Sequence, residues 1–269
     1  MTDVAGKYDH FQISFETLEK EKKYLNYGYS LNPHQTLEDK QEQLCKEVFK
    51  LANIQHNHIV VDVGFGSGEQ DFLLADLYPF SQLIGFNISQ RQVEYANYRA
   101  GIKNLGDRMI FYRGEAERME RIADSSVDRV LAIECAFYFD RPRFYKEAAR
   151  ILKKGGYLVL SDITLGPRLK WLADNSPKYK RAGTLKKNKK QWEYYFQTKL
   201  IKNISNVTKQ GAQESVFQIL RTLPKIDQPL RGDWLQLALS SQLVALGLRL
   251  HLIQYHLILL EKVKNTFKR

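Results

Sequence analysis

The 269-residue sequence has only two cysteines and no long uninterrupted apolar segment. A membrane-spanning helix needs roughly 20 consecutive apolar residues, and the polar, charged N-terminal stretch lacks the apolar core of a secretory signal. Cys45 and Cys135 lie far apart and do not resemble the dense cysteine framework of a small secreted domain. We therefore expect a cytoplasmic protein with no transmembrane segment and two ordinary buried thiols.

Acidic residues are fewer than basic ones, 30 against 41, which leaves a net charge of +11. Such an excess can attract nucleic acid, anionic lipid or an acidic substrate. Much of it lies in residues 167–190, "PRLKWLADNSPKYKRAGTLKKNKK", which we interpret as a solvated loop or helix surface. A separate nucleic-acid-binding module and an aromatic-basic signature are both missing, so we expect no nucleic-acid partner.

The histidines do not form a metal-ligand pattern. His56 and His58 precede the first predicted strand, at the wrong edge of a sheet for catalysis, with no cysteine or carboxylate cluster beside them. His251 and His256 fall in the last predicted strand, where a separation of five residues places them on opposite faces. We predict no metal site.

From residue 59 onward, short apolar runs alternate with amphipathic segments. Helices are expected near 69–77, 89–103 and 140–153, after a helix that Thr36 and Asp39 begin as a capping box. Strands are expected at 59–63, 82–86, 109–113, 128–133 and 156–161, followed by a possible strand at 201–209 and a last strand within 250–263. Strands that alternate with helices predict a parallel sheet covered on both faces.

The chain is expected to form one domain, residues 1–269. We assign residues 1–35 to an N-terminal lid segment and 36–163 to a cofactor-binding core. Residues 164–248, where the alternation stops and two helical stretches are expected near 212–222 and 233–246, are assigned to a lid and substrate insertion. Residues 249–269 supply the last strand and a tail.

The first strand runs into a glycine-rich turn, "VVDVGFGSGEQ" at residues 60–70. Ligands of doubly wound sheets bind beyond the carboxyl ends of the strands, where the first such turn is a main contact. A dinucleotide site has the spacing G-x-G-x-x-G, but here the spacing is G-x-G-x-G. Asp62 would repel a pyrophosphate and attract a cationic group, so the electrostatics favour S-adenosylmethionine, which carries an ammonium, a carboxylate and a sulfonium.

Five motifs in order resemble class I S-adenosylmethionine-dependent methyltransferases. They are "LNYGYS", the glycine turn, "IGFNISQRQVEYANYRA", "FYRGEAERM" and "DRVLAIECAFYFDRPRFYKEAARILKKGGYLVLSDI". They are most similar to the subgroup that includes erythromycin-type O-methyltransferases and sterol and tocopherol C-methyltransferases. The resemblance covers residues 24–163. It implies an α/β, Rossmann-like, mostly parallel seven-stranded sheet with an antiparallel last strand, helices on both faces and a helical lid.

The resemblance also implies where S-adenosylmethionine binds. The backbone of Gly64 and Gly66 would approach its methionine part without a Cβ clash. Asn87 stands where many class I enzymes place an acidic residue to hold the ribose hydroxyls, and an amide there makes weaker, neutral bonds. Glu115 matches the position that accepts from the adenine amino group. The full set of expected cofactor contacts is Tyr27, Tyr29, Asp62, Gly64, Gly66, Gly68, Asn87, Ile88, Gln92, Glu115, Ala116 and Ile133.

Methyl transfer from a sulfonium is an in-line displacement, in which positioning the nucleophile about 3 to 3.5 Å from the methyl carbon is the main contribution. An oxygen nucleophile also needs a general base. The catalytic candidates are Glu134, Tyr138 and His34. Tyr138 replaces a histidine that related sequences often carry, and a phenol of pKa near 10 is a poor base at neutral pH. Asp162, at the end of the fifth strand, is expected near the substrate.

The sequence is compatible with several functions. The leading one is methylation of a small-molecule acceptor at oxygen, by a monomer or homodimer, and the basic lid would favour an acidic acceptor. The alternatives are a C-methyltransferase acting on an isoprenoid or sterol-like substrate, an RNA methyltransferase that uses residues 167–190, and a non-catalytic Rossmann-like binding protein.

Overall fold

The computed structural model describes residues 4–18, 24–32, 34–176 and 179–263. They form a seven-stranded sheet in the order β3-β2-β1-β4-β5-β7-β6, in which β7 is antiparallel to both of its neighbours and the other pairs are parallel. The predicted fold class is confirmed. The strands are β1 (Ile59–Val63), β2 (Gln82–Asn87), β3 (Met109–Arg113), β4 (Val127–Ile133), β5 (Leu152–Leu165), β6 (Phe196–Asn203) and β7 (Ile253–Lys262).

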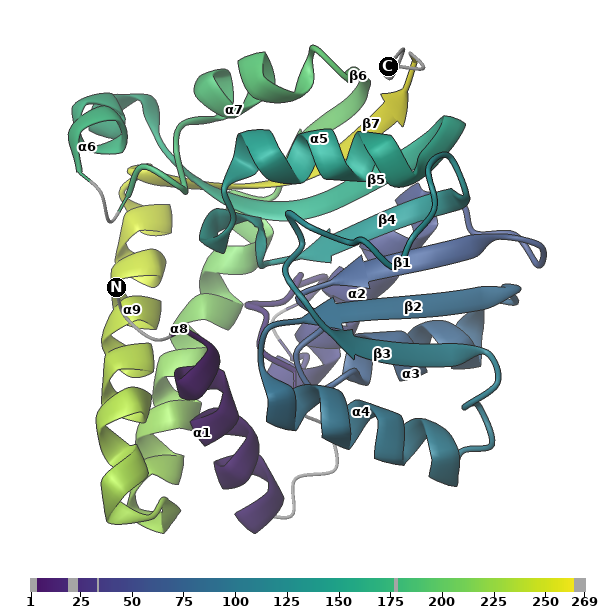
Figure 1. Cartoon of the computed structure of the whole chain (residues 1–269). Coiled ribbons are helices and arrows are strands. Elements are labelled where there is room, and N and C mark those ends of the chain that lie inside the picture. The colour runs from purple at the N-terminus through teal and green to yellow at the C-terminus, as the bar shows by residue number, and fades with distance from the viewer. Residues whose placement is uncertain (1–3, 19–23, 33, 177–178, 264–269) are drawn as a thin grey trace.

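Helices cover both faces of the sheet and gather beyond the carboxyl ends of its parallel strands (Figure 1). α2, α3 and α4 pack on one face, and α5 and α7 pack on the other. α1, α8 and α9 lie at the carboxyl edge (Figure 1). The helices are α1 (Val4–Thr17), α2 (Leu37–Ala52), α3 (Glu69–Leu77), α4 (Gln90–Ile102), α5 (Arg141–Ile151), α6 (Lys170–Asn175), α7 (Leu185–Trp192), α8 (Ser205–Thr222) and α9 (Arg231–Arg249).

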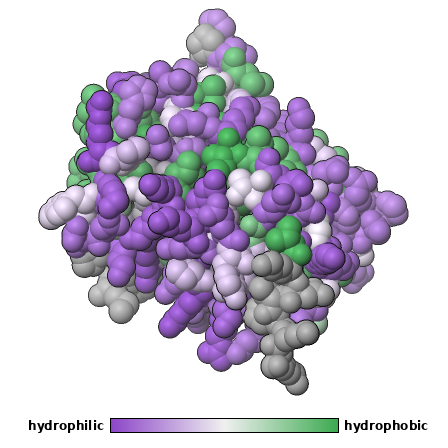
Figure 2. All heavy atoms as spheres, turned by 90° about the horizontal axis from the view of Figure 1, so that it is seen from above, coloured by the Kyte–Doolittle hydropathy of each residue, from purple (hydrophilic) through white to green (hydrophobic). Residues whose placement is uncertain are grey.

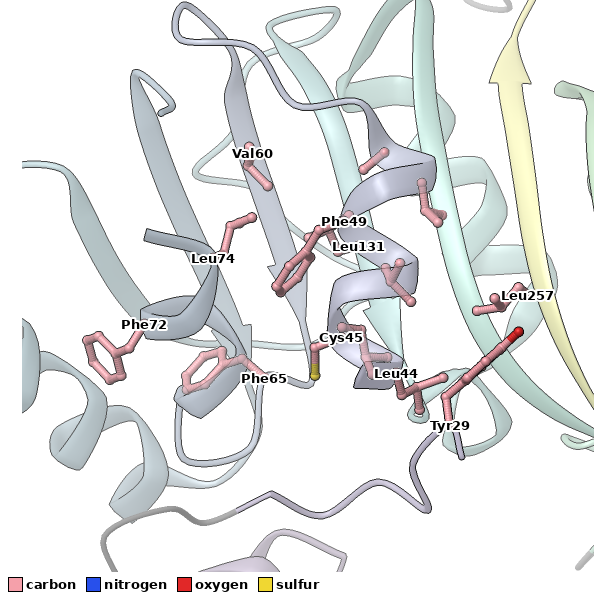
Figure 3. Packing of buried hydrophobic residues seen from close by; sticks show 14 of the residues in the cluster. Tyr29, Leu44, Cys45, Phe49, Val60, Phe65, Phe72, Leu74, Leu131 and Leu257 are labelled. Atoms are coloured by element: carbon pink, nitrogen blue, oxygen red, sulfur yellow. The ribbon is translucent and has the colours of Figure 1, made fainter. Parts of the chain in front are cut away.

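The sheet is held by apolar layers on its two faces. β1 is buried nearly throughout, which explains its almost continuous run of valine and isoleucine. On one face, Phe49 of α2 lies beside Leu131 of β4, and Leu44 of the same helix lies beside Tyr29 (Figure 3). Each such side chain contributes about 1.5 to 3 kcal/mol when it is fully buried. The fixed strands in turn hold the loops at their carboxyl ends in place.

The sequence predicted how two helices begin or end, namely the start of α2 and the end of α5. The capping box before α2 is confirmed, because the Thr36 side chain accepts from the Asp39 N–H and the Asp39 carboxylate accepts from the Thr36 N–H. The helix expected near residues 140–153 ends at Ile151, and its C-cap is Leu152 in an extended conformation rather than a glycine. Leu152 already pairs with β4, and the pairing resumes only at Tyr157. Residues 153–156 therefore form a bulge within β5, where Gly155 has a φ of +77°.

The region after β5 contributes to the sheet as well as to the helices at its edge. β6 starts at Phe196 rather than at residue 201 and forms the edge strand beyond β7. α6 and α7 lie on the upper side of Figure 1, and the same side is mostly hydrophilic in Figure 2. Cys45 and Cys135 are buried free thiols, as predicted. Among the described residues, none of the helices combines the length and the apolar character that a bilayer crossing requires.

Candidate active site

The glycine turn lies between β1 and α3, next to the point where strand order reverses around β1. Gly64 and Gly66 have φ values of +68° and +61°, a left-handed conformation that favours glycine. A Cβ on Gly64 would lie 2.7 Å from the Cβ of Cys135, whereas a Cβ on Gly66 would meet no heavy atom within 4 Å. The backbone at Gly66 is therefore bare toward open space, which lets a ligand approach it closely.

That open space is a cavity of about 530 Å³ at the carboxyl edge of the sheet. Its walls are the loops that follow β1, β2, β3 and β4, together with α1. Pockets of this size are typical of small-molecule and cofactor sites. The expected site residues that line it are Gly64, Gly66, Asn87, Ile88, Gln92, Glu115, Ala116, Ile133, Glu134 and Tyr138.

Asn87 and Gln92 form a polar corner of the cavity. The Asn87 amide donates to the carbonyl oxygen of Gly66 at 3.2 Å and to Oε1 of Gln92 at 2.8 Å. The Ser89 N–H donates to Oδ1 of Asn87 at 3.2 Å. Gln92 is fully buried, yet its Nε2 has no hydrogen-bond partner among the described residues. An unpaired buried amide costs about 1 to 3 kcal/mol, so this corner fits a ligand that accepts a hydrogen bond there.

Glu134 follows β4 with a φ of +54°, an uncommon conformation for a residue with a side chain. Such local strain occurs often at functional sites. Burial raises the pKa of its carboxyl to about 8. Oε2 accepts from the Tyr27 N–H at 2.9 Å and from the Tyr255 hydroxyl at 2.5 Å. Both donors bind the same oxygen, which leaves Oε1 for a ligand in the cavity.

Tyr138 lies opposite α1 at the edge of the cavity. The Tyr8 hydroxyl donates to the Tyr138 hydroxyl at 3.1 Å, and the two rings meet edge to face with centroids 6.0 Å apart. Burial raises the pKa of Tyr138 above its ordinary value. The Tyr138 hydroxyl is therefore neutral at physiological pH and can donate or accept a hydrogen bond.

Polar contacts fasten α1 over the glycine turn and the start of α4, among them an ion pair of Glu16 with Arg91 at 2.7 Å. The Ser67 hydroxyl donates to Oε1 of Gln12 at 2.6 Å. Asp9 accepts from the Ser89 hydroxyl at 2.5 Å and from the Arg91 N–H at 3.1 Å, so its carboxylate caps α4. These bonds hold Val4 and Tyr8 of α1 against the cavity.

Five expected residues do not line the cavity. Asp62 is fully buried behind the glycine turn, where it accepts from the Gln70 amide at 2.5 Å. Burial raises its pKa to about 7 and raises the pKa of neighbouring Asp71 as well. Gly68 is the N-cap of α3, and a Cβ on it would lie 3.2 Å from the Phe72 ring. These two residues shape the turn from behind.

The other three lie in the N-terminal segment. His34 is exposed, and its backbone N–H donates to Oδ1 of Asn32. Tyr29 is buried against α2, and its hydroxyl accepts from Lys202 at 2.9 Å. The Tyr27 ring points to α9, where its hydroxyl lies 3.2 Å from the Ser241 hydroxyl. The part of Tyr27 that contacts the site is its backbone N–H, which donates a hydrogen bond to Glu134.

Asp162 does not face the cavity either. It is fully buried and forms a bidentate ion pair with Arg141, at 2.7 and 3.0 Å, which also raises the pKa of that guanidinium. Its role is therefore to fix the start of α5. The described residues do not bring three metal-binding side chains together.

Some residues that line the cavity were not predicted from the sequence. They are Tyr8 and Tyr24 near the N-terminus, Glu117 after β3, and Arg143 and Arg181. The signal for α1 was available, because Tyr8, Phe11 and Phe15 recur at helical spacing. Arg181 gave no such signal. It reaches the cavity from the basic segment, and its guanidinium donates to the carbonyl oxygen of Tyr138 at 2.8 Å.

The fold and the edge cavity together define a class I methyltransferase architecture. Residues 61–160 match the family described as "Methyltransferase domain". This part of the chain is a methyltransferase domain, which confirms the family predicted from the five motifs.

Two curated relatives are natural-product O-methyltransferases. The chain is 33% identical to erythromycin 3''-O-methyltransferase of Saccharopolyspora erythraea over 141 residues, which is 52% of this chain and 46% of that protein. It is 29% identical to 27-O-demethylrifamycin SV methyltransferase of Amycolatopsis mediterranei over 182 residues, 67% of this chain and 65% of that protein. The chain thus spans about half to two thirds of the length of these relatives.

Solved structures share the fold over nearly the whole chain. The cyclopropane synthase MmaA2 from Mycobacterium tuberculosis has a TM-score of 0.78 at 16% identity, covering 97% of each chain. The [4+2]-cyclase SpnF has a TM-score of 0.79 at 19% identity, covering 97% of this chain and 95% of that one. The names of these enzymes state different reactions. The fold alone therefore does not determine the reaction, which depends on the residues of the site.

Proposed function

We propose that this protein transfers a methyl group from S-adenosylmethionine to an oxygen atom of a small-molecule acceptor. The observation that carries the proposal is the composition of the edge cavity. It joins a bare backbone at Gly66, an unpartnered buried amide at Gln92 and a carboxyl of raised pKa at Glu134. The natural-product O-methyltransferases to which the chain is similar support the same reaction.

The cavity residues fit the cofactor from end to end. Gly64 and Gly66 would receive its amino-acid part along bare main chain. Asn87 and Gln92 would hold the ribose hydroxyls, for which the free Nε2 of Gln92 is a ready donor. Glu115 and Ala116, which also line the cavity, would lie beside the adenine. The bound cofactor would supply a methyl group on a cationic sulfur, which is already activated for displacement.

The chain's own contribution is to position the acceptor and to receive its proton. An acceptor hydroxyl that bonds to the ionised Glu134 at Oε1 would pass its proton to that oxygen as the oxygen–carbon bond forms and the methyl–sulfur bond breaks, with the neutral thioether as the leaving group. Tyr255 and the Tyr27 backbone hold the carboxyl through Oε2 while this happens. With a pKa of about 8 the carboxyl is mainly protonated at neutral pH, so its ionised fraction acts as the base, and this fraction grows as the pH rises toward 8. We propose oxygen rather than carbon as the acceptor atom because the cavity supplies this base.

α1 would exclude water from the site. Its bonds to Ser67, Ser89 and Arg91 keep Tyr8 over the cavity, opposite Tyr138. Closing an active site in this way strengthens the electrostatic interactions inside it.

The test is transfer of labelled methyl from S-adenosylmethionine to a panel of hydroxylated macrolides and polyketide glycosides, analysed by mass spectrometry. We expect a mass gain of one methylene on an oxygen, and loss of the product in Glu134→Gln. Methylation at carbon, or a Glu134→Gln protein with full activity, would contradict the assignment of oxygen and of the base. Equal turnover without S-adenosylmethionine would contradict the proposal as a whole.

A further inference from the structure

The outer face of α8 and α9 exposes an unusual number of large apolar side chains. Leu235, Leu239, Leu243 and Leu246 recur at intervals of three or four residues, so they form one stripe along α9. The neighbouring helix α8, which packs on α9, adds two exposed apolar side chains, Phe217 and Leu220. Each of these six side chains is between 47% and 62% exposed. We call this surface the leucine face.

The leucine face is separate from the surface that α9 uses for folding. Trp234, Ala238 and Ala245 are buried on the other side of the helix, so α9 is apolar on two sides where a surface helix needs only one. α9 also forms an outer edge of the molecule, beyond the carboxyl ends of the parallel strands (Figure 1). Contiguous exposed apolar surface of this kind marks a contact with a partner or a membrane.

Within the two helices that carry the leucine face, the exposed charges have a single sign. In α8 and α9, all of whose residues the structure describes, the exposed charged side chains are Lys209, Arg221 and Arg249. The acidic groups of the two helices are engaged elsewhere. Glu214 accepts from Lys40 at 2.6 and 2.7 Å, and Asp233 lies 2.6 Å from His10.

One end of the leucine face is hollowed beside two of these cations. Lys209 and Arg249 line the hollow together with Phe217, Gln210, Gln213 and Glu214. The carboxylate of Glu214 is bonded to Lys40, which leaves the two exposed cations to set the sign of the charge there. An anionic headgroup would meet two cations and amide donors in this hollow, with an apolar ring beside it for an acyl chain.

We propose that the leucine face docks on an anionic lipid bilayer. A helix of 19 residues is about 28 Å long, and α9 carries leucines along its length and Arg249 at its end, where Lys209 of α8 lines the same hollow. Helices that lie in the membrane interface have this arrangement, with the apolar side chains inserted and the basic groups at the lipid phosphates.

A second copy of the chain suits this face less well. In a twofold pairing the same patch meets itself, so the exposed cations would approach one another with no exposed acid of α8 or α9 to neutralise them. Docking on a bilayer would place α1, which contacts α9, close to the lipid surface. This inference does not depend on the proposed methyl transfer, and each can fail without the other.

The experiment is sedimentation of the full chain with vesicles of phosphatidylcholine alone and of phosphatidylcholine mixed with phosphatidylglycerol. We expect binding to the mixed vesicles only, weakened about fivefold for each cation removed in Lys209→Gln/Arg249→Gln. Leu239→Ser/Leu243→Ser should weaken binding about tenfold or more. Lys186→Gln/Lys190→Gln removes the same charge from exposed sites on α7, and Ile102→Ser removes an exposed apolar side chain from α4. Both control proteins should bind as the parent does.

Thermal unfolding of each variant shows whether the fold is retained. Absence of binding to anionic vesicles would overturn the proposal, as would equal binding by the parent and the folded Leu239→Ser/Leu243→Ser protein. Self-association that this double substitution abolishes, without vesicle binding, would assign the face to a second copy. Selective binding of an acidic amphipathic peptide in place of vesicles would assign it to a protein partner and would also overturn the proposal.

Discussion

The Tyr255 hydroxyl donates a hydrogen bond of 2.5 Å to Oε2 of Glu134, across 121 positions of the chain. The bond links β7, the antiparallel strand, to the loop that follows β4. Tyr255 is fully buried, and its hydroxyl also lies 3.4 Å from the Ser161 hydroxyl. None of the described residues of β7 lines the cavity, yet Tyr255 of this strand holds the carboxyl of Glu134, which does line it.

The protonation of Glu134 should make cofactor preference depend on pH. Its carboxyl has a pKa of about 8, so it is mainly neutral below pH 8 and anionic above it. An anionic Glu134 attracts the cationic sulfonium of S-adenosylmethionine and has no such attraction for the neutral thioether of S-adenosylhomocysteine. We expect the ratio of the two affinities, measured by calorimetry, to shift toward S-adenosylmethionine as the pH rises through about 8. The amino group is common to both ligands, so its effect cancels in the ratio. A ratio that does not change with pH would show that Glu134 does not lie near the sulfur.

Tyr255→Phe should move this transition to higher pH. The hydrogen bond from Tyr255 stabilises the ionised carboxylate and so lowers the pKa of Glu134 against the effect of burial. A hydrogen bond to a charged group contributes about 1.5 to 3 kcal/mol, and we expect an upward shift of about one pKa unit. The same affinity ratio, measured across pH, gives the midpoint. Tyr157→Phe, a change on β5 outside the cavity, should leave the midpoint where it is in the parent.

Glu134→Gln should change how stability varies with pH. Because the folded pKa of about 8 lies above the ordinary value of 4.5, the native state binds more protons than the unfolded state between these limits. The free energy of unfolding therefore falls as the pH rises through this window, by at most about 1.4 kcal/mol per pH unit. Urea unfolding of Glu134→Gln should show a shallower fall. Asp62, whose pKa is raised to about 7, remains in both proteins, so parallel curves would show that Glu134 is not held neutral by burial.

Gln92→Met should weaken cofactor binding with little effect on folding. The substitution removes the Nε2 donor that has no partner among the described residues, along with the acceptor for Asn87. Loss of one hydrogen bond to the ribose, at about 1 to 1.5 kcal/mol, corresponds to roughly a tenfold weaker affinity. Gln90→Met, on the exposed side of the same helix, is the matched control and should bind normally. Equal affinity of the two variants would place the ribose elsewhere.

Asp9→Ala should loosen α1 from the site. The Asp9 carboxylate joins α1 to Ser89 and to the backbone at Arg91, and loss of such a cap costs about 0.5 to 2 kcal/mol. Hydrogen exchange should become faster in residues 4–17 and at the start of α4, and S-adenosylmethionine should dissociate faster. Asp76→Ala, at an exposed position on α3, is the control. Unchanged exchange in α1 would show that the bonds of Asp9 are not needed to hold the helix, which also contacts Ser67 through Gln12 and Arg91 through Glu16.

The parts of the molecule that the sequence predicted well are those determined by short-range patterns. β1 and β3 lie where their β-branched and apolar runs indicate, and α3 follows the glycine turn without delay. The cavity residues that follow β1 to β4 were found because each comes directly after a recognisable strand. Their placement needs only the rule that ligands of doubly wound sheets bind at the carboxyl edge.

The residues that were misplaced depend on contacts between distant segments. Asp162 follows the same rule as Glu134, yet a buried pair with Arg141 keeps it from the cavity. Tyr29 was expected over the cofactor, but its hydroxyl is bonded to Lys202, which is 173 residues away. No local pattern in the sequence specifies either partner. α1 was missed for another reason, because its charged residues obscured the apolar spacing of Tyr8, Phe11 and Phe15.

The most direct test of the account is calorimetric titration of the chain with S-adenosylmethionine, in the parent, in Gly66→Val and in Gly106→Val. Valine at Gly66 would project into the cavity, whereas Gly106 lies in an exposed loop with equal space around it. We predict saturable binding at one site in the parent and in Gly106→Val, and none in a Gly66→Val protein that still unfolds cooperatively. No binding by the parent at millimolar cofactor, or equal binding by a folded Gly66→Val protein, would contradict the account.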